Sequence, residues 1–279
     1  MTALAGREAL EVGARRLAPS PHARRDAELL LMRVLGHDRA WLLTHPDASL
    51  NLAQSQQFES WIERRARHEP VQYILGEQEF YGLSFRVTPD VLIPRPETEH
   101  LVEAVLQRVP AERRLRICDV GTGSGAIAVV LAHALPQAEL TALDHSCAAL
   151  AVAEENAERH GVTGRIRFVE SDLLAAVRGE RFDVVVSNPP YVADSETLEP
   201  QVRDYEPHGA LFAGATGLEV YRRLIPEARE ALDTGGWLIM EIGHGQREGL
   251  AGLLADWDAV DFLPDLQGIP RVATARRRS

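Results

Sequence analysis

The chain has 279 residues, a formal net charge of −11 at pH 7, 45% hydrophobic residues and 25% charged residues. This composition is typical of a globular protein, and the length fits two domains of unequal size. No stretch approaches the ~20 apolar residues of a membrane span, so the composition excludes a membrane-spanning chain and a disordered one.

Acidic residues are concentrated in the C-terminal part of the chain. Residues 1–110 carry 13 arginines against 15 acids, whereas residues 111–279 carry 17 against 26. Because phosphate contacts dominate duplex-DNA binding, this distribution argues against a duplex-DNA enzyme. It does not exclude RNA bound through the more balanced N-terminal part.

Cysteine usage and the N-terminus indicate the compartment. The only two cysteines, Cys118 and Cys147, predict reduced thiols, and the histidines lack ligand spacing, so no metal is expected. Charged residues interrupt the apolar positions of residues 1–17, so this segment lacks the core of a signal peptide. We expect a cytoplasmic protein.

Residues 1–75 carry only helix signals and predict a small all-helical domain. Ser20-Pro21 predicts a helix start, and Gly36 ends the apolar pattern that follows. Asn51 with Gln54 resembles a capping box at the start of a later helix. Such a domain could recognise a substrate, or it could serve as a stabilising or dimerising cap; the residues alone do not decide.

Residues 76–95 predict a β-hairpin that links this domain to a second one, residues 96–279. Apolar residues alternate up to the turn residues Pro89-Asp90, and a second strand is expected at Val91-Leu92-Ile93.

From Leu115 onward strands and helices alternate, which predicts an α/β fold with a seven-stranded doubly wound sheet. A short loop joins the last two strands, so one of them should run antiparallel. The expected strands are 115–120, 139–143, 165–169, 182–187, 236–242, 260–263 and 271–275.

A glycine-rich loop follows the first strand and opens a helix. Gly121, Thr122, Gly123, Ser124 and Gly125 are candidate cofactor-binding residues, because glycines let the backbone approach a ligand at a helix N-terminus. The loop also satisfies the looser dinucleotide pattern, so by itself it does not separate S-adenosylmethionine from NAD.

Two acidic residues end the next strands. Asp144 follows the second strand, where a carboxylate can accept both ribose hydroxyls, and Asp172 follows the third, where an adenine would lie. Either acid could instead be an ordinary helix N-cap.

The run Phe182 to Tyr191 is the most informative segment. Its apolar strand stops at Asn188-Pro189-Pro190-Tyr191, and the residue before a proline is held extended. The side-chain oxygen of Asn188 and the carbonyl of Pro189 could then accept both hydrogens of a planar –NH2 group, with Tyr191 as a flat wall. A plain strand-to-helix loop and a core tyrosine are the structural alternatives.

The joint order of these motifs resembles the release factor glutamine methyltransferase family. The resemblance spans essentially the whole chain and implies a helical domain followed by a class I methyltransferase sheet that binds S-adenosylmethionine through Gly121 to Gly125, Asp144 and Asn188. The segments that carry it are Leu92 to Glu99, Asp119 to Gly125, Asp144, Ser187 to Tyr191, Tyr205-Glu206-Pro207, Ala210-Leu211, Glu241-Ile242-Gly243 and Gln246.

The resemblance also implies a substrate. Asn188 to Tyr191 would hold the glutamine of a Gly-Gly-Gln loop in class 1 peptide chain release factors, and we expect a monomer. Arg95 could hold the substrate peptide or pair with Glu97 or Glu99. The sequence departs from the family at Phe212 to Gly217, and Leu173 occupies a position that is sometimes aromatic and packed on adenine.

Two other functions are compatible with parts of the pattern. A methyltransferase acting on an exocyclic amine of an RNA or DNA base would use the same Asn-Pro-Pro-Tyr motif, but the acidic charge disfavours it. A non-catalytic nucleotide-sensing module would use the glycine loop, but it has no need of the acceptor groups at Asn188.

Overall fold

The computed structural model describes residues 5–278, which form two compact units. The first unit comprises residues up to Glu77 together with Glu199–Tyr205, and the second comprises Gln78–Leu198 and Glu206 onward. No helix in the described range is long and apolar enough to cross a membrane. Within the same range, no group of three or more histidine, cysteine or acidic residues could hold a metal ion.

The first unit is helical. The capping box predicted at Asn51 is present, and Gly36 ends a helix in the left-handed conformation. The start predicted at Ser20-Pro21 is wrong by two residues: the backbone carbonyl of Ser20 accepts from the amide of Ala23, and this turn precedes the helix. The helices are α1 (Gly6–Leu17), α2 (Ala23–Leu35), α3 (Arg39–Thr44), α4 (Leu52–Ala66), α5 (Val71–Leu75) and α9 (Pro200–Arg203).

A buried ion pair joins α2 to α4. Nε of Arg65 donates to Oδ2 of Asp26 over 2.7 Å, and Nη1 of Arg65 donates to the carbonyl of Glu69 over 3.1 Å. Both charged side chains are at most 10% exposed. Removing one partner of a buried pair leaves the other charge without compensation, which costs several kcal/mol.

The second unit opens with a two-stranded hairpin, β1 (Glu77–Phe80) and β2 (Leu83–Arg86). Pro89-Asp90 does form a turn, in which the amide of Val91 donates to the carbonyl of Thr88 over 3.1 Å, but Val91-Leu92-Ile93 forms no strand, so this turn does not close the hairpin. The chain reverses at Tyr81 and Gly82, both at positive φ, as the favoured two-residue hairpin turn requires.

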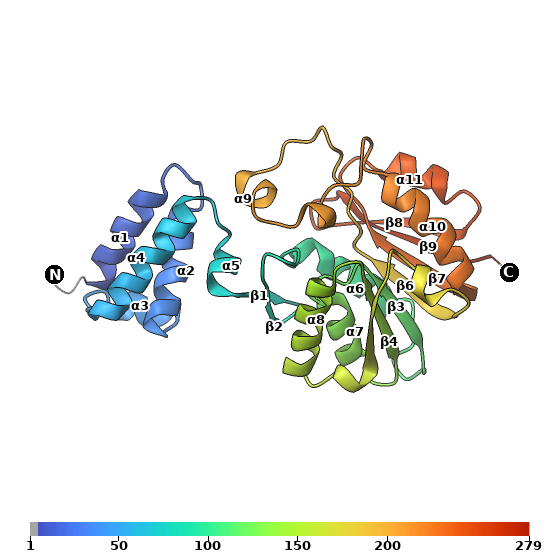
Figure 1. The fold of residues 1–279 in the computed structure, drawn as a ribbon, viewed down its shortest axis with the longest axis horizontal. Helices are drawn as coiled ribbons and strands as arrows, with labels where there is room; N and C mark the ends of the chain where they lie inside the picture. The colour runs from blue at the N-terminus through green and yellow to red at the C-terminus, as the bar shows by residue number, and fades with distance from the viewer. Residues whose placement is uncertain (1–4, 279) are drawn as a thin grey trace. The chain divides into compact units, whose positions relative to one another are not determined.

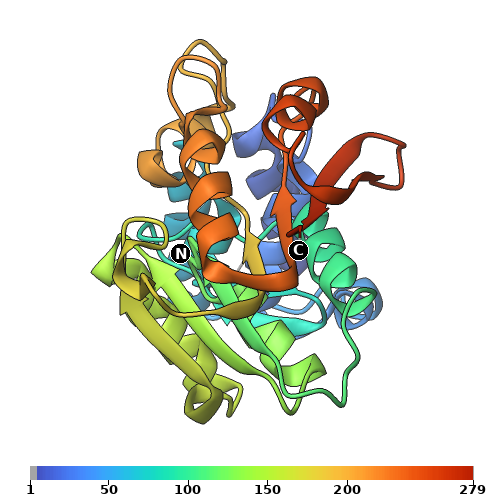
Figure 2. The ribbon, with the colours of Figure 1, turned by 90° about the vertical axis from the view of Figure 1, so that its right-hand side faces the viewer.

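The predicted seven-stranded sheet is confirmed. Its strand order is β5-β4-β3-β6-β7-β9-β8, and β9 runs antiparallel to both of its neighbours. The β8–β9 hairpin, in red, extends outward at this edge of the sheet (Figure 2). The strands are β3 (Arg116–Val120), β4 (Glu139–Asp144), β5 (Ile166–Glu170), β6 (Phe182–Ser187), β7 (Leu232–Glu241), β8 (Asp258–Pro264) and β9 (Pro270–Arg276).

Helices cover both faces of the sheet. Figure 1 shows α7 and α8 in green and α10 and α11 in orange on opposite sides of the strands. Neighbouring residues of β6 face different cores, so Val184 and Val186 pack with α7, whereas Val185 packs with α10. The helices are α6 (Glu99–Leu106), α7 (Ala126–Ala134), α8 (Cys147–Arg159), α10 (Glu219–Ala231) and α11 (Arg247–Leu253).

The ion pair in the helical unit gives a stability prediction. Arg65→Met should lower the free energy of unfolding by about 3 kcal/mol, because it leaves Asp26 buried and unpaired. Arg67→Met is the matched control, since the side chain of Arg67 forms an exposed pair with Glu63, and its loss should change stability by less than about 0.5 kcal/mol. Urea unfolding of both variants measures the difference, and equal losses would contradict a special role for the buried pair.

Candidate active site

Four strand ends lie next to one another at one edge of the sheet. The last residue of β3, Val120, pairs with Leu143 of β4 on one side and with Ser187 of β6 on the other. Asp144 of β4 pairs with Glu170 of β5. The loops that follow these parallel strands therefore share one edge, where open α/β sheets bind ligands.

The glycine loop is held on the end of β4. The amides of Gly121 and Thr122 both donate to the carbonyl of Leu143 over 2.8 Å. Gly125 has a φ of +79°, and a Cβ there would lie only 3.0 Å from the Cβ of Ala153 in α8. Glycine is therefore needed at this position for both the conformation and the close helix approach.

Asp144 supports this loop and still has acceptor capacity. Its Oδ2 accepts from the amide of Gly123 over 2.9 Å, and its Oδ1 accepts from the amide of Ser146 over 3.0 Å. Nδ1 of the exposed His145 also lies 3.5 Å from Oδ1. A carboxylate offers about four acceptor positions, so acceptor capacity remains for a ligand with neighbouring hydroxyl groups. This donor and acceptor pattern fits the ribose of a nucleoside cofactor.

Asp119 is a buried acid directly before the loop. Thr122 donates its hydroxyl to Oδ2 over 2.7 Å, whereas Oδ1 has no hydrogen-bond partner among the described residues. Burial raises the pKa of this carboxyl to about 7. Asp119 therefore places an incompletely satisfied acid next to the glycine loop.

The two residues predicted to lie beside the adenine, Asp172 and Leu173, both line the cavity at this edge of the sheet. Asp172 is mostly exposed and pairs with Arg223 of α10 at 2.6 Å. Leu173 has a positive φ of 49° and lines the same cavity as Asp172. Their contact with adenine stays a prediction.

Asn188 is held in a chain of side-chain hydrogen bonds. Its Nδ2 donates to Oγ1 of Thr98 over 3.1 Å, and the Thr98 hydroxyl donates to Oε2 of Glu241 over 2.6 Å. Thr98 lies at the end of a short 3-10 helix, Pro96–Thr98, and Glu241 is the last residue of β7. The amide nitrogen of Asn188 is thus engaged, and its oxygen is left for a ligand.

Tyr191 lies on the other side of the same carboxylate. Its hydroxyl donates to Oε1 of Glu241 over 3.3 Å, and burial raises its pKa. Asn188, Pro189 and Pro190 line the cavity. Tyr191 is not among the described residues that line it. Stacking of Tyr191 on a substrate amide stays a prediction.

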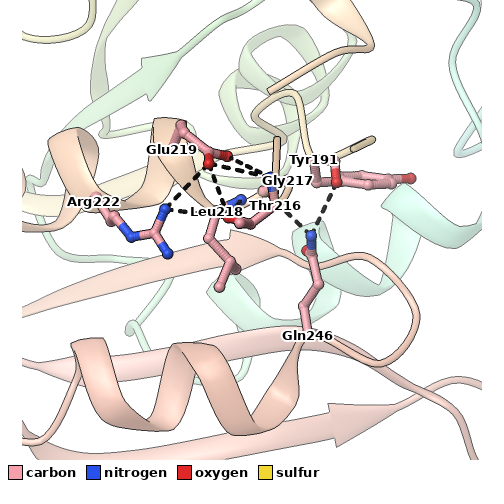
Figure 3. Close-up of polar contacts among 7 residues, drawn as sticks. All are labelled: Tyr191, Thr216, Gly217, Leu218, Glu219, Arg222 and Gln246. Atoms are coloured by element: carbon pink, nitrogen blue, oxygen red, sulfur yellow. Dashed lines mark hydrogen bonds and ion pairs between the residues drawn. The ribbon is translucent and has the colours of Figure 1, made fainter. Parts of the chain in front are cut away.

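The backbone of Tyr191 is fixed by Gln246 (Figure 3). Nε2 of Gln246 donates to the carbonyls of Tyr191 and Gly217, over 2.9 and 3.1 Å. A Cβ at Gly217 would lie 2.4 Å from the Tyr191 carbonyl oxygen, so only glycine fits. The Gly217 turn falls in the segment that departs from the family pattern, and there Thr216 donates to the carboxylate of Glu219.

Arg95 pairs with Glu206, and not with Glu97 or Glu99 as considered from the sequence. Its Nη2 donates to Oε1 of Glu206, whose Oε2 accepts from the amide of Ile93 over 3.2 Å. Glu206 is buried, whereas Arg95 is partly exposed and lines the cavity. Arg95 therefore has a structural partner and could also reach a ligand.

These loops enclose one cavity of about 330 Å³, the size of a small-ligand site. Sequence reasoning missed Thr98, Glu206 and Glu241, although all three stand in segments that carry the family resemblance. The cavity-lining residues include Pro94, Arg95, Thr98, Gly121, Thr122, Gly123, Ser124, Asp144, Asp172, Leu173, Asn188, Pro189 and Pro190.

Comparison with known proteins identifies the family. Residues 8–76 match the PrmC N-terminal domain, and residues 98–204 match the methyltransferase small domain. The release factor glutamine methyltransferase of Koribacter versatilis is 47% identical over 93% of this chain and 93% of its own length. That of Geobacter sulfurreducens is 45% identical over 91% and 90%. The chain belongs to the release factor glutamine methyltransferase family.

Membership establishes the enzyme class and the cofactor. This chain is a methyltransferase that depends on S-adenosylmethionine. A 16S rRNA methyltransferase from T. Thermophilus, solved in complex with AdoMet and guanosine, superposes with a TM-score of 0.55 at 21% identity. The match covers 72% of this chain and 50% of that one and confirms the class I methyltransferase fold.

The Asp144 carboxylate gives a binding prediction. Asp144→Ala should weaken S-adenosylmethionine binding by about 1.5–3 kcal/mol, the range for hydrogen bonds to a charged group. Asp172→Ala is the comparison, and the exposure of Asp172 predicts a loss below about 1 kcal/mol. Isothermal titration calorimetry measures both losses, and unchanged affinity in Asp144→Ala would contradict the assignment.

Glu241 gives a prediction about stability and pH. Burial raises its pKa from an ordinary 4.5 to about 7. Between these values the unfolded chain has lost a proton that the folded protein keeps, so this group lowers the free energy of unfolding as pH rises. Glutamine at this position does not titrate. The free energy of unfolding of Glu241→Gln, relative to that of wild type, should therefore rise by on the order of 1–3 kcal/mol from pH 5 to pH 8.

Urea unfolding of wild type and Glu241→Gln at the two pH values measures this gain. Asp119 titrates in both proteins, so its contribution cancels in the comparison. A difference that stays constant with pH would show that Glu241 keeps its ordinary pKa.

Proposed function

We propose that this methyltransferase transfers the methyl group to the side-chain amide nitrogen of the glutamine in the Gly-Gly-Gln motif of peptide chain release factors. The names of the relatives support a release factor as substrate. The motif Asn188 to Tyr191 supports a primary amide as the group that is methylated.

One observation carries this proposal. The side-chain N–H of Asn188 donates to the hydroxyl oxygen of Thr98, and Asn188 lines the same cavity as the glycine loop and Asp144. Its oxygen therefore remains as a neutral acceptor near the place where the methyl donor binds. A neutral acceptor suits the N–H of an uncharged amide, because neither group carries a charge that the other would have to compensate.

The chemical difficulty is the weak nucleophilicity of an amide nitrogen, whose lone pair is delocalised into the carbonyl. The bound cofactor supplies an electrophilic methyl group on a sulfonium. The oxygen of Asn188 accepts one N–H of the substrate, and we propose that the carbonyl of Pro189 accepts the other. Two fixed acceptors orient the nitrogen toward the methyl carbon at about 3–3.5 Å.

The protein needs no dedicated base for this reaction. The nitrogen forms its bond to carbon as the carbon–sulfur bond breaks, and it becomes cationic. An N–H proton is then acidic enough to leave to water. Asn188 acts by orientation and by stabilising positive charge on the N–H groups, not by proton transfer.

The flanking glycines of the motif suit a recessed amide. Residues without side chains let the substrate backbone come close enough for the amide to reach Asn188. We further propose that the helical unit, which matches the PrmC N-terminal domain, binds the release factor away from this loop. Such a contact raises affinity without touching the chemistry.

The site of methylation tests the function directly. Purified enzyme incubated with S-adenosylmethionine and a release factor should replace one amide hydrogen of the Gly-Gly-Gln glutamine by a methyl group, as located by tandem mass spectrometry. A methyl group found on a nucleobase, or only on another residue, would refute the proposal.

Asn188→Ala separates chemistry from binding. The variant should fold and bind S-adenosylmethionine with an affinity within about threefold of wild type, while kcat falls at least about 100-fold, since an orienting acceptor is lost in the transition state. Single-turnover assays and calorimetry measure the two effects. An equal loss of cofactor affinity and turnover would make Asn188 a binding residue only.

A further inference from the structure

Two residues outside the glycine loop and the Asn-Pro-Pro-Tyr motif form a chain of hydrogen bonds with the side chain of Asn188. Thr98 and Glu241 are 5% and 2% exposed, so water does not compete for their hydrogen bonds. Thr98 lies between the other two, accepting from Asn188 and donating to Glu241. Buried groups arranged in this way have few alternative partners.

The number of hydrogens on Thr98 fixes the direction of the chain. A threonine hydroxyl has one hydrogen, and the 2.6 Å contact with Glu241 uses it. The oxygen of Thr98 can then only accept, so Asn188 must turn its –NH2 group toward Thr98. The reverse amide orientation would place two acceptor oxygens against each other.

We propose that Thr98 and Glu241 are positioning residues that hold the side-chain oxygen of Asn188 toward the substrate nitrogen. This inference deepens the proposed function and rests on it for the identity of the substrate. Without Thr98, both amide orientations of Asn188 are open, and one of them presents –NH2 to the substrate amide. That orientation offers no acceptor for the reacting nitrogen.

The charge state of Glu241 should control the direction of the chain. An ionised carboxylate only accepts, whereas a protonated one can donate to Thr98 and free the hydroxyl hydrogen for the oxygen of Asn188. Turnover should therefore fall as the pH drops and Glu241 gains a proton.

The charged and titratable groups that face Glu241 come from several elements. Glu97 raises its pKa, Arg271 of β9 lowers it, and the hydroxyl of Tyr191 donates to its side chain. Tyr221 of α10 donates to its backbone carbonyl over 2.8 Å. Burial is the largest influence and raises the pKa of Glu241 to about 7. The loss of turnover on acidification should therefore occur near neutral pH.

Thr98→Val and Thr98→Ser test the proposal on the full-length enzyme with a release factor as substrate. Valine keeps the shape but removes the hydroxyl, and we expect kcat to fall at least about 10-fold with S-adenosylmethionine affinity within about threefold. Serine keeps the hydroxyl and should retain kcat within about threefold. If the buried valine unfolds the protein, Thr98→Ala removes the same hydroxyl and is judged by the same criteria.

A double-mutant cycle separates positioning from a structural role. If Thr98 acts through Asn188, Thr98→Val should cost little further activity in an Asn188→Ala background under single-turnover conditions. The loss of turnover that we expect in wild type as the pH drops should also be absent in Thr98→Val. Additive losses in the cycle, or wild-type activity in Thr98→Val, would overturn the inference.

A readout without substrate keeps the two proposals distinguishable. The side-chain amide signals of Asn188, assigned by their loss in Asn188→Ala, should shift in Thr98→Val and not in Thr98→Ser in the cofactor-bound protein. Unchanged signals in Thr98→Val would overturn the positioning role even if the substrate is a release factor. Shifted signals together with a wild type that leaves the glutamine unmethylated would refute only the proposed substrate.

Discussion

The register of four parallel strands is the constraint on which the active site depends. Because β3 pairs with both β4 and β6, the residues after Val120, Leu143 and Ser187 emerge at the same height. Backbone hydrogen bonds then fix the loops to these strand ends, including the bonds from Gly121 and Thr122 to the carbonyl of Leu143. A slip of one residue in any strand would turn its terminal side chain to the other face of the sheet. The start of the glycine loop is thus fixed to the end of β4 by the protein's own hydrogen bonds.

The site also concentrates buried acids at its two ends. Asp119 lies beside the glycine loop and Glu241 lies behind Asn188, and burial raises the pKa of both carboxyls to about 7. Each acid accepts the hydroxyl of a threonine, Thr122 in one case and Thr98 in the other. Buried ionisable groups lower stability near neutral pH, and such a cost is common where a fixed polar geometry serves catalysis.

The sequence predicted the parts of this structure that depend on local patterns. Apolar strand runs such as Phe182 to Ser187 and the capping box at Asn51 depend on neighbouring residues, and both are present. The hairpin turn was placed wrongly, because Pro89-Asp90 is a strong turn signal. The actual turn contains Tyr81 at positive φ, and a tyrosine in the sequence does not predict that conformation.

The missed site residues depend on contacts between distant segments. Thr98 and Glu241 are 143 positions apart, and Arg95 and Glu206 are 111 apart, so no local pattern pairs them. A threonine inside a proline-rich turn and a glutamate at a strand end are both common at ordinary surface positions. The pairing of β6 with β7 brings Glu241 near Asn188, and Thr98 then links the two side chains, which only the tertiary structure shows.

In the proposed reaction, the side-chain oxygen of Asn188 accepts a hydrogen bond from the amide nitrogen that is methylated. The most direct test is a crystal structure of the enzyme with S-adenosylhomocysteine and a Gly-Gly-Gln peptide. We expect the glutamine nitrogen to lie within about 3.2 Å of the Asn188 oxygen, with the Asn188 nitrogen still bonded to Thr98. A glutamine amide bound elsewhere in the cavity, or an Asn188 oxygen turned to Thr98, would contradict it.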